Sequence, residues 1–135
     1  MYGFYPPEQG VGDGDQRWTK RHAVAVVPAA ARWLELTYSV DYRSIAHAGM
    51  ERRGAQAATR PVGITIRVDG EVVTDTQLTT TAPVTTYTRV PDGRAWLLIE
   101  TAVSRTVRPR DFGVADDREL GMLVRWSFVD APPAR

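Results

Sequence analysis

The chain of 135 residues contains no cysteine and only one lysine, Lys20, among its 17 basic residues. Without cysteine there can be no disulfide scaffold, thiol nucleophile or cysteine-based zinc site. A formal net charge of +1 provides no global field that would attract nucleic acid or anionic lipid. No apolar run reaches the roughly 20 residues of a membrane-spanning helix. We therefore expect neither nucleic-acid binding nor direct membrane insertion.

Groups for catalysis are also scarce. The only histidines are His22 and His47, and neither has a motif partner of the kind that accompanies a catalytic histidine. No nucleophile elbow occurs, and the alternating glycines of residues 10–14 lack the lysine and helix of a phosphate-binding loop. The sequence predicts a chain that is not an enzyme, with no catalytic residues and no cofactor.

Two pairs of aspartates are candidate calcium ligands. Asp13 and Asp15 form one pair, and Asp116 and Asp117 the other. Calcium needs six to eight oxygen ligands, and the full spacing of known loops is missing here. Turns and caps explain these residues more simply, so no metal site is predicted, although the sequence leaves a structural calcium ion open.

Apolar residues alternate with polar ones in short segments over residues 17–129. The segments with this alternation include Leu34, Leu36, Tyr38 and Val40; Val62, Ile64, Ile66 and Val68; Leu97, Ile99 and Val103; and Met122, Val124, Trp126 and Phe128. A period of two is typical of strands with one buried face. The pattern predicts an all-β fold, an antiparallel β-sandwich of jelly-roll or Greek-key type with about eight strands.

The organisation follows from the same pattern. Residues 1–15 are predicted as an irregular lead, residues 16–130 as one β-sandwich domain, and residues 131–135 as a frayed tail. Asp69-Gly70 between two alternating runs predicts a tight hairpin, because both central residues need a positive φ. Residues 44–60 form a polar insertion without a strong period, whose role the sequence leaves open.

Two tryptophans have the opposite parity to the predicted core. Trp33 shares its side of the strand with Glu35, and Trp96 shares its side with Glu100. Outward aromatic rings beside carboxylates are suited to glycans, because the ring stacks on the C–H face of a sugar and polar groups bind its hydroxyls. These four residues are the predicted glycan platform, although a loop or a partner domain could cover them. Trp18 and Trp126 are expected in the core.

Two further motifs carry a family resemblance. The first is the run of residues 3–8 (GFYPPE), followed by Arg17-Trp18-Thr19 and Val27-Pro28; the second is residues 103–107 (VSRTV) with Pro109 and then residues 116–121 (DDRELG). Together they resemble a carbohydrate-binding-like β-sandwich module, the soluble C-terminal domain of bacterial membrane glycosyltransferases and envelope-polysaccharide proteins. The resemblance implies a non-catalytic accessory domain that lies outside the cytoplasmic membrane.

The motif residues also have a structural explanation. Asp117 and Arg118 can pair across the loop before the last strand, and Gly121 permits a close backbone approach. Arg17 and Trp18 can form the matching corner, with a guanidinium stacked on an aromatic ring. These five residues are predicted to maintain the fold.

The sequence therefore supports two functions. The first is an accessory domain that contacts a glycan or docks beside a membrane glycosyltransferase, extracytoplasmic or periplasmic if the domain belongs to a membrane protein and otherwise cytoplasmic. The alternative is a structural or self-assembly domain, a homo-oligomer that uses protein–protein contacts through the threonine-rich residues 79–88 or an exposed edge strand.

Overall fold

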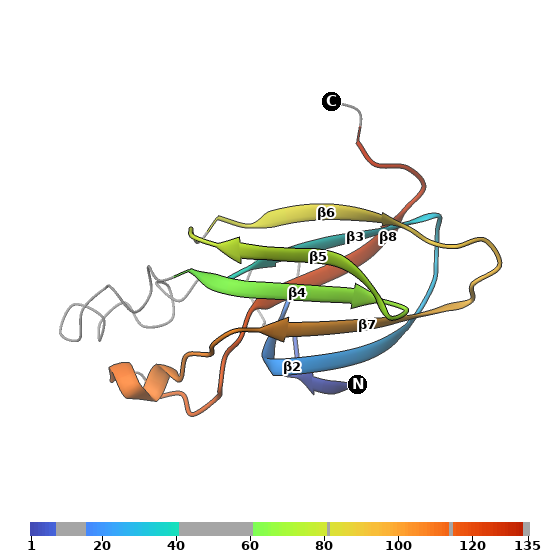
Figure 1. Ribbon diagram of the computed structural model, residues 1–135. Coiled ribbons are helices and arrows are strands. Elements are labelled where there is room, and N and C mark those ends of the chain that lie inside the picture. The colour runs from blue at the N-terminus through green and yellow to red at the C-terminus, as the bar shows by residue number, and fades with distance from the viewer. Residues whose placement is uncertain (8–15, 41–60, 81, 114, 134–135) are drawn as a thin grey trace.

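The computed structural model describes residues 1–7, 16–40, 61–80, 82–113 and 115–133. They form an antiparallel all-β fold (Figure 1). The strands are β1 (Tyr2–Phe4), β2 (Arg17–Pro28), β3 (Trp33–Ser39), β4 (Val62–Val68), β5 (Glu71–Leu78), β6 (Val84–Arg89), β7 (Trp96–Val103) and β8 (Leu123–Val129), with one 3-10 helix, η1 (Pro109–Phe112). The predicted all-β class and the number of strands are confirmed.

One long strand, β2, joins the two halves of the sheet. The strand order is β5-β4-β7-β2-β8-β3-β6, and β1 pairs with β2 outside this path. The second half of β2 pairs with β7, from His22 to Pro28, whereas its first residues, Arg17 and Trp18, pair with β8. The result is a nearly closed, barrel-like sheet, and β5 and β6 are its two edges (Figure 1).

The core consists of the side chains that alternation assigned to the inner face. Its largest fully buried apolar members are Leu34, Leu36, Ile64, Ile66, Leu97, Ile99, Leu120, Met122, Val62 and Val124. Trp18 is also buried, while Trp126 is only partly buried and packs edge-on against Phe4 with ring centroids 5.4 Å apart. At roughly 25 cal/mol per Å² of apolar surface removed from water, this burial is the main favourable contribution to folding.

The hairpin between β4 and β5 turns at the predicted dipeptide. Asp69 and Gly70 both have positive φ, 51° and 84°, as a tight two-residue turn requires. The Asp69 carboxylate also accepts a hydrogen bond from Leu98 N–H at 2.9 Å. The turn is therefore tied to β7, the next strand in the sheet.

One feature differs from the sequence-based organisation. The lead contains a short strand, β1, where irregular chain was predicted. Residues 17–28 form one continuous strand. The polar residues in its middle are the point at which β2 passes from one half of the sheet to the other. The insertion 44–60 lies outside the described residues. Within the described part of the chain, no helix is long and apolar enough to cross a membrane.

Candidate binding face on strands β6, β3 and β8

The outer face of β6, β3 and β8 presents polar and aromatic side chains in three cross-strand rows. Cα pairing gives the rows as Arg89–Trp33–Val129, Tyr87–Glu35–Ser127 and Thr85–Thr37–Arg125. We refer to these nine residues as the candidate face. They point away from the core because Leu34 and Leu36, their alternating neighbours on β3, are fully buried. One face thus combines two aromatic rings, a carboxylate, four hydroxyls and two guanidinium groups.

Glu35 occupies the centre of this face. Its Oε2 accepts a hydrogen bond from the Tyr87 hydroxyl at 2.9 Å, and its Oε1 accepts one from Ser127 Oγ at 3.2 Å. The hydrogen bond to Glu35 raises the pKa of Tyr87 above its ordinary value of 10.0. An ionised carboxylate has about four lone-pair sites, so both oxygens can accept further hydrogen bonds from a ligand.

The indole of Trp33 lies beside this carboxylate in the adjacent row. The Arg89 guanidinium lies over its ring, with Cζ 5.8 Å from the ring centroid. Arg89 also forms an ion pair with Asp92 at 3.5 Å, but that carboxylate is 98% exposed, so solvent screens the pair. The guanidinium is therefore weakly held and can move from the ring or donate hydrogen bonds to a ligand.

Hydroxyl groups form the third row. Thr37 Oγ1 and Thr85 Oγ1 are 2.9 Å apart and share a hydrogen bond. Arg125 lies next to Thr37 on β8. The face therefore offers hydroxyl donors and acceptors on one side of the Glu35 carboxylate and an aromatic ring on the other.

The other half of the predicted platform lies elsewhere. Trp96 is on β7, paired with Pro28, and β8 and β2 separate β7 from β3 in the sheet. Glu100 is also on β7, between Val24 of β2 and Arg67 of β4. The structure thus brings Trp33 and Glu35 together but places Trp96 and Glu100 on the other half of the sheet, so the four residues do not form one platform.

The surroundings of Trp96 are apolar. Trp96 is 57% exposed and Val26 is 60% exposed, and the rows of β2 and β7 place Pro28 opposite Trp96 and Val26 opposite Leu98. We refer to these four residues as the apolar face. It offers few polar groups that could bind sugar hydroxyls, unlike the candidate face.

The motif residues with a predicted structural role lie at the corner where β2 meets β8. Trp18 is buried, and Arg17 Nη1 donates to the Tyr5 carbonyl over 3.4 Å. Gly121 N–H donates to the Thr19 carbonyl at 2.6 Å, and a Cβ at Gly121 would lie 2.6 Å from the Lys20 carbonyl oxygen. The close backbone approach expected at Gly121 is therefore present.

The ion pairs of this corner differ from the expected ones. Arg118 pairs with Asp116 at 2.8 Å, and Asp117 pairs with Arg110 at 2.8 Å, so Asp117 and Arg118 do not pair with each other through their side chains. It is also Arg118, not Arg17, whose guanidinium lies over an aromatic ring, 5.5 Å from the centroid of Tyr5. A two-residue spacing lets the Arg118 side chain fold back onto Asp116, which also accepts the Arg118 backbone N–H at 3.0 Å.

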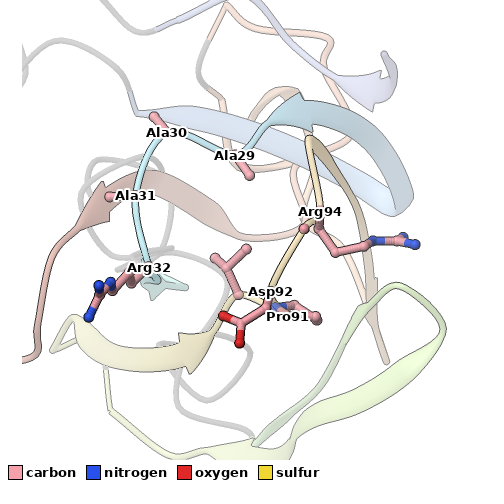
Figure 2. A pocket seen from close by; sticks show the side chains of 9 residues that line it. Ala29, Ala30, Ala31, Arg32, Pro91, Asp92 and Arg94 are labelled. Atoms are coloured by element: carbon pink, nitrogen blue, oxygen red, sulfur yellow. The ribbon is translucent and has the colours of Figure 1, made fainter.

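A shallow hollow of about 240 Å³ lies between the β2–β3 turn and the β6–β7 turn. Residues 29–32 and 90–94 line it. Figure 2 shows the Arg32 and Arg94 side chains pointing away from each other on opposite sides of the hollow, with Asp92 between them. Arg94 is held by Asp69 at 2.8 Å. The rest of the lining is three alanines, Val90, Pro91 and Gly93. No set of reactive groups therefore converges there.

The described residues contain few side chains that could serve in acid–base catalysis or bind a metal ion. His22 lies exposed on β2 opposite Ala102, while His47, Asp13 and Asp15 lie outside the described residues. Within the described ranges no group of three or more histidine, aspartate or glutamate side chains is placed to hold a metal ion. A cation at Asp116 or Asp117 would have to displace an arginine from each carboxylate.

Tyr87, Arg89, Ser127 and Arg125 were not predicted from the sequence as members of the candidate face. Their parity was readable, since each alternates with inner residues. The sequence did not reveal that β3 pairs with both β6 and β8. These pairings bring Tyr87 and Ser127 to the Glu35 carboxylate, although they are 52 and 92 positions away in the chain. The cluster of hydroxyl residues on β6 was the available signal, and it was interpreted as a surface for self-assembly.

Comparisons with known proteins add little. No protein-family model matches the chain, and no curated protein is similar to it in sequence. A crystal structure of dimeric latent PorU from Porphyromonas gingivalis resembles 77% of this chain at 10% sequence identity and a TM-score of 0.40. The chain corresponds to 10% of the length of that protein. At this level of similarity the likeness carries no functional argument.

Proposed function

We propose that this chain is a non-catalytic accessory domain that binds a glycan with the candidate face. The observation that supports it best is the row Tyr87–Glu35–Ser127 next to the indole of Trp33. Sugar recognition combines an aromatic ring on the C–H face with charged or hydroxyl partners for the sugar hydroxyls. The candidate face offers both kinds of group side by side, and its groups are held by hydrogen bonds to one another.

The preorganisation of Glu35 favours this function. Two hydrogen bonds hold the carboxylate while lone pairs remain for a ligand. A group that is already ordered loses less conformational entropy when the ligand binds. The outer surface of the sheet is not a concave pocket of the kind that small molecules prefer, so an extended glycan is the better match.

The cellular setting of the proposal comes from the short motifs around Trp18 and Asp117. We place the domain beside a membrane glycosyltransferase or another envelope-polysaccharide protein, on the extracytoplasmic side. The finer description of the fold as a jelly-roll-type β-sandwich belongs to the same proposal. It is supported by the two halves of the sheet, which lie on either side of one core.

A glycan array tests the proposal, with Trp33→Ala and Glu35→Gln as variants and Trp96→Ala as the matched control. Trp96 lies on the other half of the sheet, so its loss should leave binding unchanged. Loss of the Trp33 ring should weaken binding about fivefold, since an aromatic contact contributes on the order of 1 kcal/mol. The proposal fails if the unaltered protein binds no glycan, or if Trp96→Ala weakens binding while Trp33→Ala does not.

A further inference from the structure

On the free edge of strand β6, the backbone donors and acceptors are complementary to those of a second, antiparallel copy of the same strand. The Val90 N–H donates a hydrogen bond of 2.8 Å to the carbonyl of Arg32, the residue just before β3. Arg32 lies opposite Val90 and continues the β3–β6 register by one residue pair. In an antiparallel strand the backbone groups of successive residues point alternately to the two sides. Residues 84, 86, 88 and 90 therefore pair with β3, and the backbone groups of Thr85, Tyr87 and Arg89 point to the free edge.

The ends of this edge are set by two prolines. Pro83 and Pro91 have the same parity as Tyr87 and lie equally far from it on either side. Proline has no N–H to donate, so outward donors exist only at Thr85, Tyr87 and Arg89. The free edge is thus a short, symmetric segment centred on Tyr87.

The edge at β6 carries fewer protective features than the edge at β5. Natural edge strands are protected by lysine, proline within the strand, inward charges or bulges. Among the described strands, β5 forms the other edge, and it carries the carboxylates of Glu71 and Asp75 together with a shift in register against β4. By contrast, β6 is regular and consists of Val84, three threonines, Tyr87 and a single charged residue, Arg89.

We propose that a second copy of this chain pairs with β6 in antiparallel orientation, about a two-fold axis through Tyr87. In this register Tyr87 lies opposite its own copy, and Thr85 lies opposite Arg89 of the other copy. Every outward N–H of the segment then has a carbonyl partner, and the pairing ends where Pro83 meets Pro91. No two like charges are opposite each other, so the interface is self-complementary as a two-fold contact requires.

The pairing extends the sheet without covering the candidate face. In the combined sheet, β8-β3-β6 of one copy is followed by β6-β3-β8 of the second copy. The two candidate faces then lie side by side on one surface. The inference does not depend on what these faces bind. A short strand pairing buries less surface than a standard interface, so we expect a weak dimer.

Thr85 allows a matched test of the register, because its side chain is exposed and lies opposite Arg89 of the second copy. Sedimentation equilibrium over roughly 10 µM to 1 mM, the range of weak complexes, should show a monomer–dimer equilibrium for the unaltered chain. Thr85→Lys should raise the dimer dissociation constant and Thr85→Glu should lower it. The two-fold axis produces two equivalent pairs of residue 85 with Arg89, which together should change the dissociation constant by about two- to thirtyfold. Both variants lose the same Thr37 hydrogen bond, so their difference isolates the charge.

Amide hydrogen exchange provides a second readout that needs no variant. The N–H groups of Thr85, Tyr87 and Arg89 should become protected as the concentration rises, whereas those of Thr86 and Thr88 should be protected at all concentrations. A chain that remains monomeric throughout overturns the inference. So does a dimer in which Thr85→Lys and Thr85→Glu act alike, or one that Val26→Lys on the apolar face disrupts while Thr85→Lys does not. None of these measurements involves a glycan, so this inference and the proposed function can fail separately.

Discussion

The Tyr87 hydroxyl donates a hydrogen bond of 2.9 Å to Glu35 Oε2 from the adjacent edge strand. The two residues are directly opposite each other on β6 and β3. They form a non-hydrogen-bonded pair, in which the backbone N–H and C=O groups of each residue point away from the other strand. Side chains of such non-hydrogen-bonded pairs approach more closely than those of the alternate pairs. The carboxylate at the centre of the candidate face is therefore fixed by strand register, and the same contact raises the pKa of Tyr87.

The first prediction concerns the titration of Tyr87. Because the folded-state pKa of this phenol is raised, the contact with Glu35 contributes stability below the unfolded pKa and loses it as pH rises through the folded value. Glu35→Gln removes the negative charge, so the pKa of Tyr87 should fall toward its ordinary value of 10.0. NMR titration with ring-labelled tyrosine measures it. Tyr87→Phe identifies the signal, and an unchanged pKa in Glu35→Gln would contradict the contact.

The second prediction concerns Gly121 at the corner of β2 and β8. A Cβ at this position would lie 2.6 Å from the Lys20 carbonyl oxygen and 2.7 Å from Thr19 Oγ1. Backbone hydrogen bonds between Thr19 and both Gly121 and Met122 hold these strands together, so the strands cannot separate without losing them. Gly121→Ala should lower the free energy of unfolding by about 1–3 kcal/mol or more.

Urea unfolding followed by circular dichroism measures this change. Gly93→Asn is a suitable control, because Gly93 lies in an exposed turn with φ of 80° and open space around it, and asparagine tolerates positive φ better than other residues. It should change stability by less than about 1 kcal/mol. If the two substitutions lowered the free energy of unfolding equally, the close backbone approach at Gly121 would not be the cause of the loss.

The inward and outward sides of the strands were predictable from sequence, and so were Trp33 and Glu35 as outward residues. Alternation with fully buried Leu34 and Leu36 sufficed for that. The neighbours of Glu35 were not predictable, because Tyr87 and Ser127 reach it through pairings that are distant in sequence. Burial of apolar residues determines the parity of a strand, but many strand orders satisfy the same parity. The predicted platform therefore joined two tryptophans that belong to different halves of the sheet.

The third prediction concerns acid stability. The hydrogen bond from the Arg118 guanidinium lowers the pKa of Asp116 below its ordinary value of 3.8. A carboxyl group with a lowered folded-state pKa contributes stability above its unfolded pKa and loses it as pH falls through the folded value. The contribution of this pair should therefore begin to fall below about pH 4 and decrease further as the solution becomes more acidic. At neutral pH, Asp116→Asn should cost about 1 kcal/mol, since the pair is partly exposed.

Thermal unfolding at pH 7 and pH 3 measures this effect. Asp116→Asn should destabilise the protein at pH 7 and have a smaller effect at pH 3, where the carboxyl group is largely protonated in the unfolded chain. Asp92→Asn serves as the control, because the Asp92 side chain is 98% exposed and its ion pair with Arg89 is 3.5 Å long. An equal loss of stability at both pH values in Asp116→Asn would indicate a steric effect instead of the charge.

The fourth prediction separates the two faces by tryptophan fluorescence. Trp96 is 57% exposed and Trp18 only 5%, so acrylamide should quench the emission of Trp96 far more than that of Trp18. Trp33 on the candidate face also contributes to the quenching, so Trp96→Phe should remove a large part of the quenchable emission and Trp18→Phe almost none of it. If both indoles are equally protected from acrylamide, the exposed apolar face described here is wrong.

The same measurement discriminates between the surfaces that self-association could use. Pairing through β6 leaves Trp96 exposed, because β7 and β6 are far apart in the strand order. Quenching of Trp96 should therefore stay constant between dilute and concentrated protein, even where sedimentation detects a dimer. Trp33 lies one strand from the proposed axis, but its side chain is on the outer face, so it should also remain accessible. Protection of Trp96 at high concentration would instead mean that the apolar face is what the second copy covers.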